Sequence, residues 1–88
     1  MQEKTLQKNI LKFCKQQSII AHKTDSSSSR GWPDLTVVMP SGRVIFVELK
    51  TPVGRLSKLQ EHTHTQLRLN NAEVYVVRSL GEFESLIQ

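Results

Sequence analysis

The sequence has a single cysteine, few aromatic residues and no long apolar run. Cys14 has no partner for an internal disulfide, and four zinc ligands at finger spacing are absent. No apolar stretch approaches the roughly 18 residues that cross a bilayer, and no apolar signal region follows the first residues. These absences argue against a disulfide-stapled secreted domain, a zinc finger and a membrane protein. They predict an intracellular, cytoplasmic protein.

The composition is that of a small globular domain in which basic residues outnumber acidic ones. Apolar residues make up 38% of the chain and charged residues 23%, which is too apolar for a disordered tail. A chain of 88 residues is expected to form one domain over residues 1–88. The formal net charge of +4 indicates a polyanionic partner. A core this small is marginal alone, which favours oligomerisation.

Helical periodicity and capping signals predict three helices. Residues 3–17 carry an apolar stripe made of Leu6, Ile10, Phe13 and Cys14. Capping boxes, in which a serine precedes a glutamine or glutamate by three residues, open the other two helices at Ser57 and Ser79. The helix that starts at Ser57 should end near Asn70, with Asn71 in the left-handed position that follows it.

Short segments rich in β-branched residues predict four strands. They are residues 18–23, 35–39, 44–50 and 74–78. Between the second and third strands, Pro40-Ser41-Gly42 is a hairpin signal. The resulting order, α-β-β-β-α-β-α, predicts a small three-layer α/β or α+β domain.

The length of the hairpin loop decides whether two carboxylates meet. A three-residue loop pairs Met39 with Arg43 and, counting back, Asp34 with Glu48, at a Cα separation of about 4.5–5.5 Å. A two-residue loop would send the two carboxylates to opposite faces. Carboxylates this close repel unless a proton or cation lies between them. Hard oxygen ligands on a rigid sheet suit Mg²⁺ or Mn²⁺.

Two more charged residues are expected beside this pair. Strand alternation places Lys50 on the same face as Glu48. There its ammonium group could orient an attacking water or stabilise a phosphoryl transition state. Glu3 falls on the apolar stripe of the first helix, and a charged side chain directed at the core needs a partner. A metal held by the two carboxylates would supply that partner.

These motifs resemble the VRR-NUC branch of the PD-(D/E)XK nuclease superfamily. The residues that carry the likeness are Gly31-Trp32-Pro33-Asp34-Leu35, Phe46-Val47-Glu48-Leu49-Lys50-Thr51-Pro52, and Gly54-Arg55-Leu56-Ser57 with Gln60. The likeness runs from Glu3 to about Ser79. It implies a restriction-endonuclease-like core, in which helices flank a small mixed sheet. It also implies a hydrolase, a metal-dependent endonuclease that acts on DNA.

The resemblance also implies roles for individual residues. The metal-binding set is Asp34, Glu48, the Leu49 carbonyl and Glu3, and the catalytic set adds Lys50 and Gln60. Stand-alone members of the family are similar to Holliday-junction resolvases and act as homodimers. The resemblance therefore implies Mg²⁺ or Mn²⁺ as cofactor, branched DNA as substrate and a role in DNA repair. Compact members of this kind are typical of bacteria and their phages.

Each of these residues also has a simpler explanation. Asp34 could cap a turn, and Glu48 with Lys50 could be an ordinary ion pair on a strand. If these residues have no catalytic role, both explanations must hold at once, in the same register that pairs Asp34 with Glu48. The capping box accounts for Gln60 without an active site. The preference of acids for the first helical turn accounts for Glu3.

Basic and polar residues around the proposed site are candidates for binding DNA. They are Ser29, Arg30, Arg55 and Lys58. The serine run at 26–29 could hydrogen-bond phosphates or serve only as a connector. The lysines at 4, 8, 12 and 15 are expected to form a solvated face of the first helix. His62 and His64 stand two apart on a helix and cannot share a face, so both are expected at the surface. Trp32 is expected to pack, with stacking on a base as the alternative.

Three functions remain open at this point. The first is the nuclease, and the second is a non-catalytic DNA-binding module, with a nuclease-like fold or as an unrelated basic domain. The third is an interaction subunit of a larger assembly, whose basic face is only solvated. The set of Asp34, Glu48 and Lys50 is complete, whereas a decayed nuclease would be expected to have lost one member.

Overall fold

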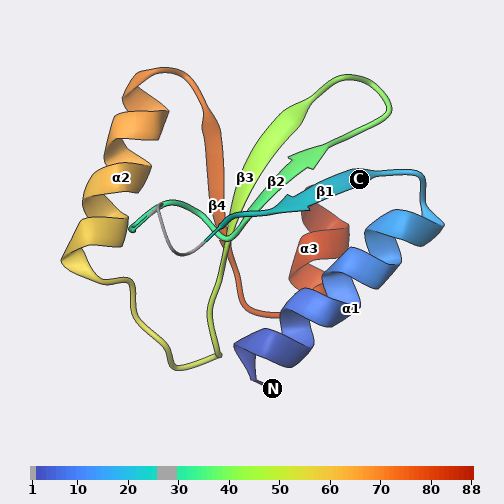
Figure 1. Ribbon diagram of the computed structural model, residues 1–88, viewed down its shortest axis with the longest axis horizontal. Coiled ribbons are helices and arrows are strands. Elements are labelled where there is room, and N and C mark those ends of the chain that lie inside the picture. Colours follow the sequence, from blue (N-terminus) through green and yellow to red (C-terminus); the bar gives the residue numbers. More distant parts are fainter. Residues whose placement is uncertain (1, 26–29) are drawn as a thin grey trace.

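Four strands form one mixed sheet and lie in it in the order of the chain (Figure 1). The computed structural model describes residues 2–25 and 30–88. The elements are α1 (Glu3–Gln16), β1 (Ile20–Lys23), β2 (Leu35–Val38), β3 (Val44–Leu49), α2 (Lys58–Leu69), β4 (Glu73–Val77) and α3 (Leu80–Leu86). β1, β2 and β3 are antiparallel neighbours, whereas β4 runs parallel to β3. The predicted element order and the predicted small mixed sheet are confirmed.

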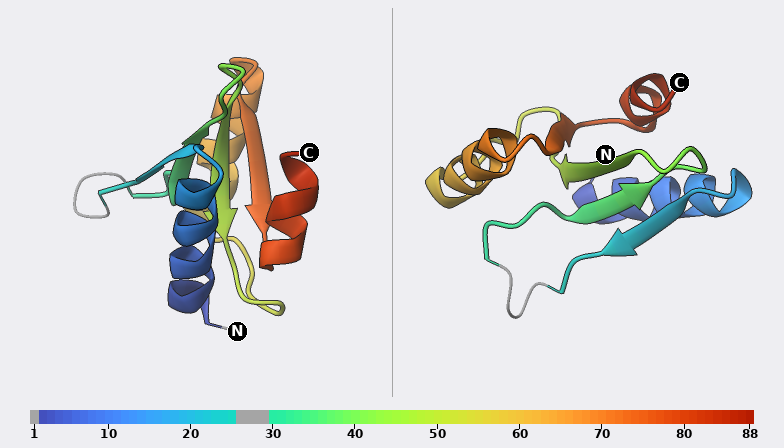
Figure 2. Two further views of the ribbon diagram at one scale, coloured as in Figure 1. Left: turned by 90° about the vertical axis from the view of Figure 1, so that its right-hand side faces the viewer. Right: turned by 90° about the horizontal axis from the view of Figure 1, so that it is seen from above.

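The helices cover both faces of the sheet. α1 and α3 lie side by side on one face, and α2 lies on the other (Figures 1 and 2). Phe13 of α1 meets Phe83 of α3 edge-on, with 6.2 Å between the ring centroids. The hydrophobic core fills the space between the sheet and the α1–α3 layer. Its most deeply buried members are Leu6, Ile10, Cys14, Leu35, Val37, Ile45, Val47, Leu49, Val77 and Phe83. Across the two described ranges, no helix is both long and apolar enough to span a membrane.

The turn after α1 shortens the first strand. Ser18 adopts a left-handed conformation with a φ of 58°. The amide of Ile19 donates to the carbonyl of Cys14 at 2.9 Å, a bond that closes the last turn of the helix. The predicted strand over residues 18–23 was therefore too long, and β1 begins at Ile20.

The hairpin between β2 and β3 has the three-residue loop that the sequence predicts. The amide of Met39 donates to the carbonyl of Arg43 at 2.9 Å, and Gly42 has a φ of 91°. Counting back along the ladder from this pair places Asp34 opposite Glu48. The predicted register is confirmed. It brings two carboxylates to one end and one face of the sheet.

Serine side chains start the second and third helices. Ser57 Oγ accepts from the Gln60 amide at 3.1 Å, and Gln60 Oε1 accepts from the Ser57 amide at 2.9 Å, which completes the predicted capping box. Ser79 Oγ accepts from the Glu82 amide at 3.1 Å. The Glu82 carboxylate, however, accepts from the amide of Arg78 at 2.7 Å. In the predicted capping box, the Glu82 side chain would accept from the amide of Ser79. It accepts instead from the amide one residue earlier, so this half of the box differs from the prediction.

Gly31 allows the turn before Asp34 to pack against α2. Its φ is 78°, a conformation that side chains disfavour. A Cβ atom there would lie 2.7 Å from Leu59 Cγ and 2.9 Å from Thr63 Oγ1. Both the backbone conformation and the close approach to α2 therefore require glycine at this position.

We expect Gly31→Ala to lower the free energy of unfolding by about 1–3 kcal/mol, because strain and overpacking add. Gly81→Ala is the matched control, since a Cβ there would meet nothing closer than Ser79 Oγ at 3.9 Å. The control should equal the wild type or exceed its stability by up to about 1 kcal/mol. Chemical denaturation followed by circular dichroism measures both variants. Equal stability of Gly31→Ala and the wild type would contradict the close packing of this turn against α2.

Candidate active site

Asp34 and Glu48 lie together where β2 begins and β3 ends. Their carboxyl groups are within hydrogen-bonding reach of each other. The Leu49 amide donates to Asp34 Oδ2 at 2.7 Å, and the Thr24 amide donates to the Asp34 carbonyl at 2.9 Å. Glu48 is only 1% exposed. The sheet therefore holds two acids side by side and buries one of them.

The environment of Glu48 opposes its ionisation. Its pKa is raised to about 9, first by burial and then by the hydrogen bond to Asp34 and the negative charge of that residue. Lys50 lowers the pKa of Glu48 in part, and Glu3 raises it. Glu48 therefore keeps a proton at neutral pH unless a cation approaches. Adjacent carboxylate oxygens are the donors that Mg²⁺ and Mn²⁺ prefer, so this donor set fits a divalent ion.

Two side chains of α2 reach Glu48 from the neighbouring layer. His64 Nε2 lies 3.1 Å from Glu48 Oε1, and both side chains are buried. Gln60 Nε2 lies 3.5 Å from Glu48 Oε2, at the outer limit of a hydrogen bond. Because Gln60 Oε1 also accepts from the Ser57 amide, this side chain caps the helix and faces the acid pair at once.

The predicted surface position of His64 is wrong, whereas His62 is exposed. The two histidines do point in different directions, but His64 lies four residues after Gln60 and shares its face of α2. That i, i+4 spacing is the signal that would have found it. Burial and the charge of Arg68 lower the pKa of His64.

Glu3 lies at the rim of the site and not in the core. It is exposed in the first turn of α1, and with Asp34 and Leu49 it lines a cavity of about 190 Å³. The predicted direction toward the core is wrong, because this turn lies beside that cavity and the buried stripe starts at Leu6. Within residues 2–25 and 30–88, no three His, Cys, Asp or Glu side chains are close enough to hold a metal together. Glu3 therefore lines the same cavity as Asp34 but does not join Asp34 and Glu48 in a three-residue metal group.

The basic residues differ in how close they lie to the pair. Lys50 is half-buried, and its charge acts on both Glu48 and His64. Arg30, Arg55 and Lys58 are exposed. Ser29, the fourth predicted DNA contact, lies outside the described residues.

Arg78 supports the site and was not among the predicted residues. Its Nη1 donates to the carbonyls of Thr51 and Gly54, both at 2.7 Å. These bonds attach the loop between Lys50 and Arg55 to the end of β4. No local motif signals this contact, because it depends on the parallel pairing of β3 with β4.

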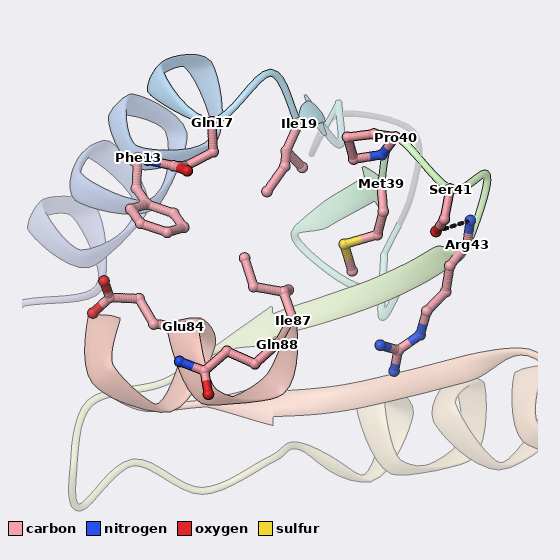
Figure 3. Close-up of a pocket in the computed structure, with 10 residues that line it drawn as sticks. All are labelled: Phe13, Gln17, Ile19, Met39, Pro40, Ser41, Arg43, Glu84, Ile87 and Gln88. Atoms are coloured by element: carbon pink, nitrogen blue, oxygen red, sulfur yellow. Dashed lines mark hydrogen bonds between the residues drawn. The ribbon is translucent and has the colours of Figure 1, made fainter.

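A larger cavity than the one beside Glu3 lies away from the acid pair. It measures about 640 Å³ and opens between the last turns of α1 and α3 and the β2–β3 hairpin (Figure 3). Phe13, Met39 and Ile87 line it, and Arg43 stands at its edge. The Arg43 guanidinium is bound to the carboxylate of Glu73, at 3.0 and 2.6 Å. This cavity contains neither Asp34 nor Glu48, so its size does not make it the candidate site.

Two other residues behave as the simpler interpretations predict. Cys14 is buried in the core, where burial raises the pKa of its thiol to about 11. Trp32 packs edge-on against Phe46, with 5.8 Å between the ring centroids.

We expect the metal-free protein to lose stability as the pH rises from about 4.5 toward 9. Over this range folded Glu48 keeps the proton that the unfolded chain has already released, so the folded state binds more protons and its stability falls. Glu48→Gln removes the titration and preserves the shape. In urea denaturation the variant should exceed the wild type by roughly 1–3 kcal/mol at about pH 8, a gap that shrinks toward acid pH. Parallel curves for the two proteins would contradict a protonated Glu48.

Known proteins resemble this chain along most of its length. The sequence profile of the VRR-NUC domain matches residues 1–80. The chain is 32% identical over 79 residues to "Putative nuclease p44" of Acyrthosiphon pisum secondary endosymbiont phage 1, which covers 90% of this chain and 85% of that protein. A solved structure described as a VRR_NUC domain matches with a TM-score of 0.84 at 29% identity, over 97% of this chain and 92% of the other. The agreement of sequence, fold and motif order shows that this protein belongs to the VRR-NUC domain family.

Proposed function

We propose that this protein is a metal-dependent endodeoxyribonuclease that hydrolyses phosphodiester bonds in DNA. The observation that carries the proposal is the pairing of Asp34 with buried Glu48, whose ionisation is suppressed until a cation compensates it. The half-buried Lys50 acts on the same carboxylate. The VRR-NUC match and the relative named as a nuclease support the same conclusion.

The acid pair supplies the metal site. Asp34, Glu48 and the Leu49 carbonyl would hold Mg²⁺ or Mn²⁺, and Glu3 would complete the acidic site directly or through water. When bound, the ion lowers the pKa of a water molecule and neutralises charge on the scissile phosphate. Asp34 is already oriented for this role by the Leu49 amide at 2.7 Å.

Lys50 and Gln60 act on the reacting groups. The Lys50 ammonium orients the attacking water and stabilises the extra negative charge on the phosphate in the transition state. Gln60 lines the site beside Glu48. Water adds to phosphorus, the P–O3′ bond breaks, and the proton passes to the departing O3′, which leaves a 5′-phosphate.

Exposed basic groups around the site would hold the DNA backbone. Arg30 precedes the turn that enters β2, and Arg55 and Lys58 lie in the loop and first turn that follow β3. Ser29 would add a hydroxyl contact to phosphate. The net charge of +4 favours this polyanionic partner.

A homodimer would place two such sites on one branched substrate. Support for a dimer comes from the sheet face that carries α2, which packs mainly against β4 and reaches β3 through the contacts of Gln60 and His64 with Glu48. On this face the paired residues Ile20, Val38 and Val44 form an apolar row across β1, β2 and β3. Ile20 is 66% exposed and Val44 43% exposed. We name Ile20, Val38, Val44 and Trp32 the apolar sheet patch.

Four-way (Holliday) junctions are the proposed substrate, with a role in DNA repair or recombination. A single domain over residues 1–88 that pairs as a two-fold dimer would suit a compact resolvase. The phage origin of the relative that is 32% identical supports action in the cytoplasm of a bacterial host.

Cleavage of a mobile four-way junction tests the proposed function, with a linear duplex of the same sequence beside it. We expect cutting of the junction with Mg²⁺ or Mn²⁺, none with EDTA, and a loss of at least about 100-fold in Lys50→Ala or Asp34→Ala. Lys12→Ala, on the outer face of α1, is the matched control and should cut at the wild-type rate.

Residual wild-type cutting by folded Lys50→Ala or Asp34→Ala would contradict the assigned site. Tight, salt-dependent junction binding with no cutting under any metal would instead favour the alternative, a non-catalytic DNA-binding module. Equal cutting of the junction and the duplex would contradict junction selectivity alone.

The oligomeric state tests the role of the apolar sheet patch. We expect light scattering to give twice the mass of the chain for the wild type and a monomer for Ile20→Glu, because a buried charge would oppose the contact. Leu69→Glu is the matched control, since Leu69 is 70% exposed at the end of α2 and is not one of the patch residues. A dimer that persists in folded Ile20→Glu would contradict this interface.

A further inference from the structure

His64 is a buried histidine to which the mechanism above gives no part. It is 1% exposed, and its Nε2 lies 3.1 Å from Oε1 of Glu48, which is equally buried. Its second ring nitrogen, Nδ1, is buried and has no hydrogen-bond partner among the described residues. Buried polar atoms without a partner are uncommon and need a physical explanation.

The lone Nδ1 atom selects one form of the imidazole. A protonated ring, or the neutral tautomer with hydrogen on Nδ1, would leave a buried N–H without an acceptor, which costs more than an unused lone pair. The favoured form has a bare Nδ1 and a hydrogen on Nε2. In that form Nε2–H donates to Oε1 of the Glu48 carboxyl group, which accepts.

This hydrogen bond fixes which oxygen of Glu48 remains available. Oε1 is engaged by His64 and Oε2 lies 3.5 Å from Gln60 Nε2, while the carboxyl group of Asp34 is within hydrogen-bonding reach of Glu48. Asp34 is held independently by the Leu49 amide at 2.7 Å. Both acids are thus oriented by N–H donors before any ion arrives, and each keeps oxygen lone pairs for a shared cation.

We infer that His64 is a positioning residue, whose Nε2–H orients the Glu48 carboxylate for the divalent cation that it shares with Asp34. The inference rests on the proposed function, because it concerns the same metal site. It makes α2 part of the metal site through a residue that never touches the ion. Gln60 and His64, four residues apart, then contact the two oxygens of one carboxylate from a single helix face.

Calorimetric titration of DNA-free protein with Mn²⁺ tests this role without relying on activity. We expect His64→Leu to weaken Mn²⁺ binding about 10–100-fold, the usual effect of removing a group that orients a metal ligand. His64→Gln should restore most of the affinity, because its amide nitrogen can occupy the position of Nε2. His64→Asn, whose amide is one carbon shorter, should bind as weakly as His64→Leu.

His62→Leu is the matched control two residues away on the exposed face of α2, and it should bind Mn²⁺ like the wild type. Should His64→Leu fail to fold, the contrast between the glutamine and asparagine variants still decides the matter. Wild-type affinity in a folded leucine or asparagine variant, or equal weakening in glutamine and asparagine, would overturn the inference alone. No Mn²⁺ binding by the wild type, or unchanged binding by Asp34→Asn, would overturn the proposed function beneath it.

Discussion

The structure depends on keeping the buried side chain of Glu48 next to the carboxyl group of Asp34. Burying Glu48 beside Asp34 opposes folding, because each acid loses water and the two repel when ionised. The sheet sustains this arrangement because Val47 and Leu49, the neighbours of Glu48 in β3, are buried in the core on the other face. A slip of one residue would send Glu48 into that core and expose both neighbours. The apolar face therefore enforces the register that brings the acids together.

The remaining elements supply the polar groups that such a site needs. Main-chain amides hold Asp34, α2 delivers Gln60 and His64 to Glu48, and Arg78 ties the following loop to β4. These contacts come from strands and a helix on both sides of the sheet. A divalent cation at the proposed metal site would replace the proton on Glu48, and this exchange would couple metal binding to stability.

Local signals in the sequence were enough for most of the fold and for the meeting of the two acids. The Pro40-Ser41-Gly42 loop fixed the register, and the Ser57 capping box fixed the start of α2, because both features are decided by neighbours in the chain. The errors lie where contacts are non-local or at the end of an element. His64 is buried because α2 packs over Glu48, Arg78 acts across two parallel strands, and a left-handed Ser18 shortens β1.

A crystal structure of the protein grown with Mn²⁺, with diffraction collected for the anomalous signal of manganese, tests the central claim most directly. We predict one strong peak shared by the carboxylates of Asp34 and Glu48, at about 2.0–2.6 Å from their oxygens. The Nε2–H bond of His64 to Glu48 should remain in place. A manganese peak elsewhere, or ordered protein without a peak while Lys50 pairs directly with both acids, would contradict the claim that this acid pair is a metal site.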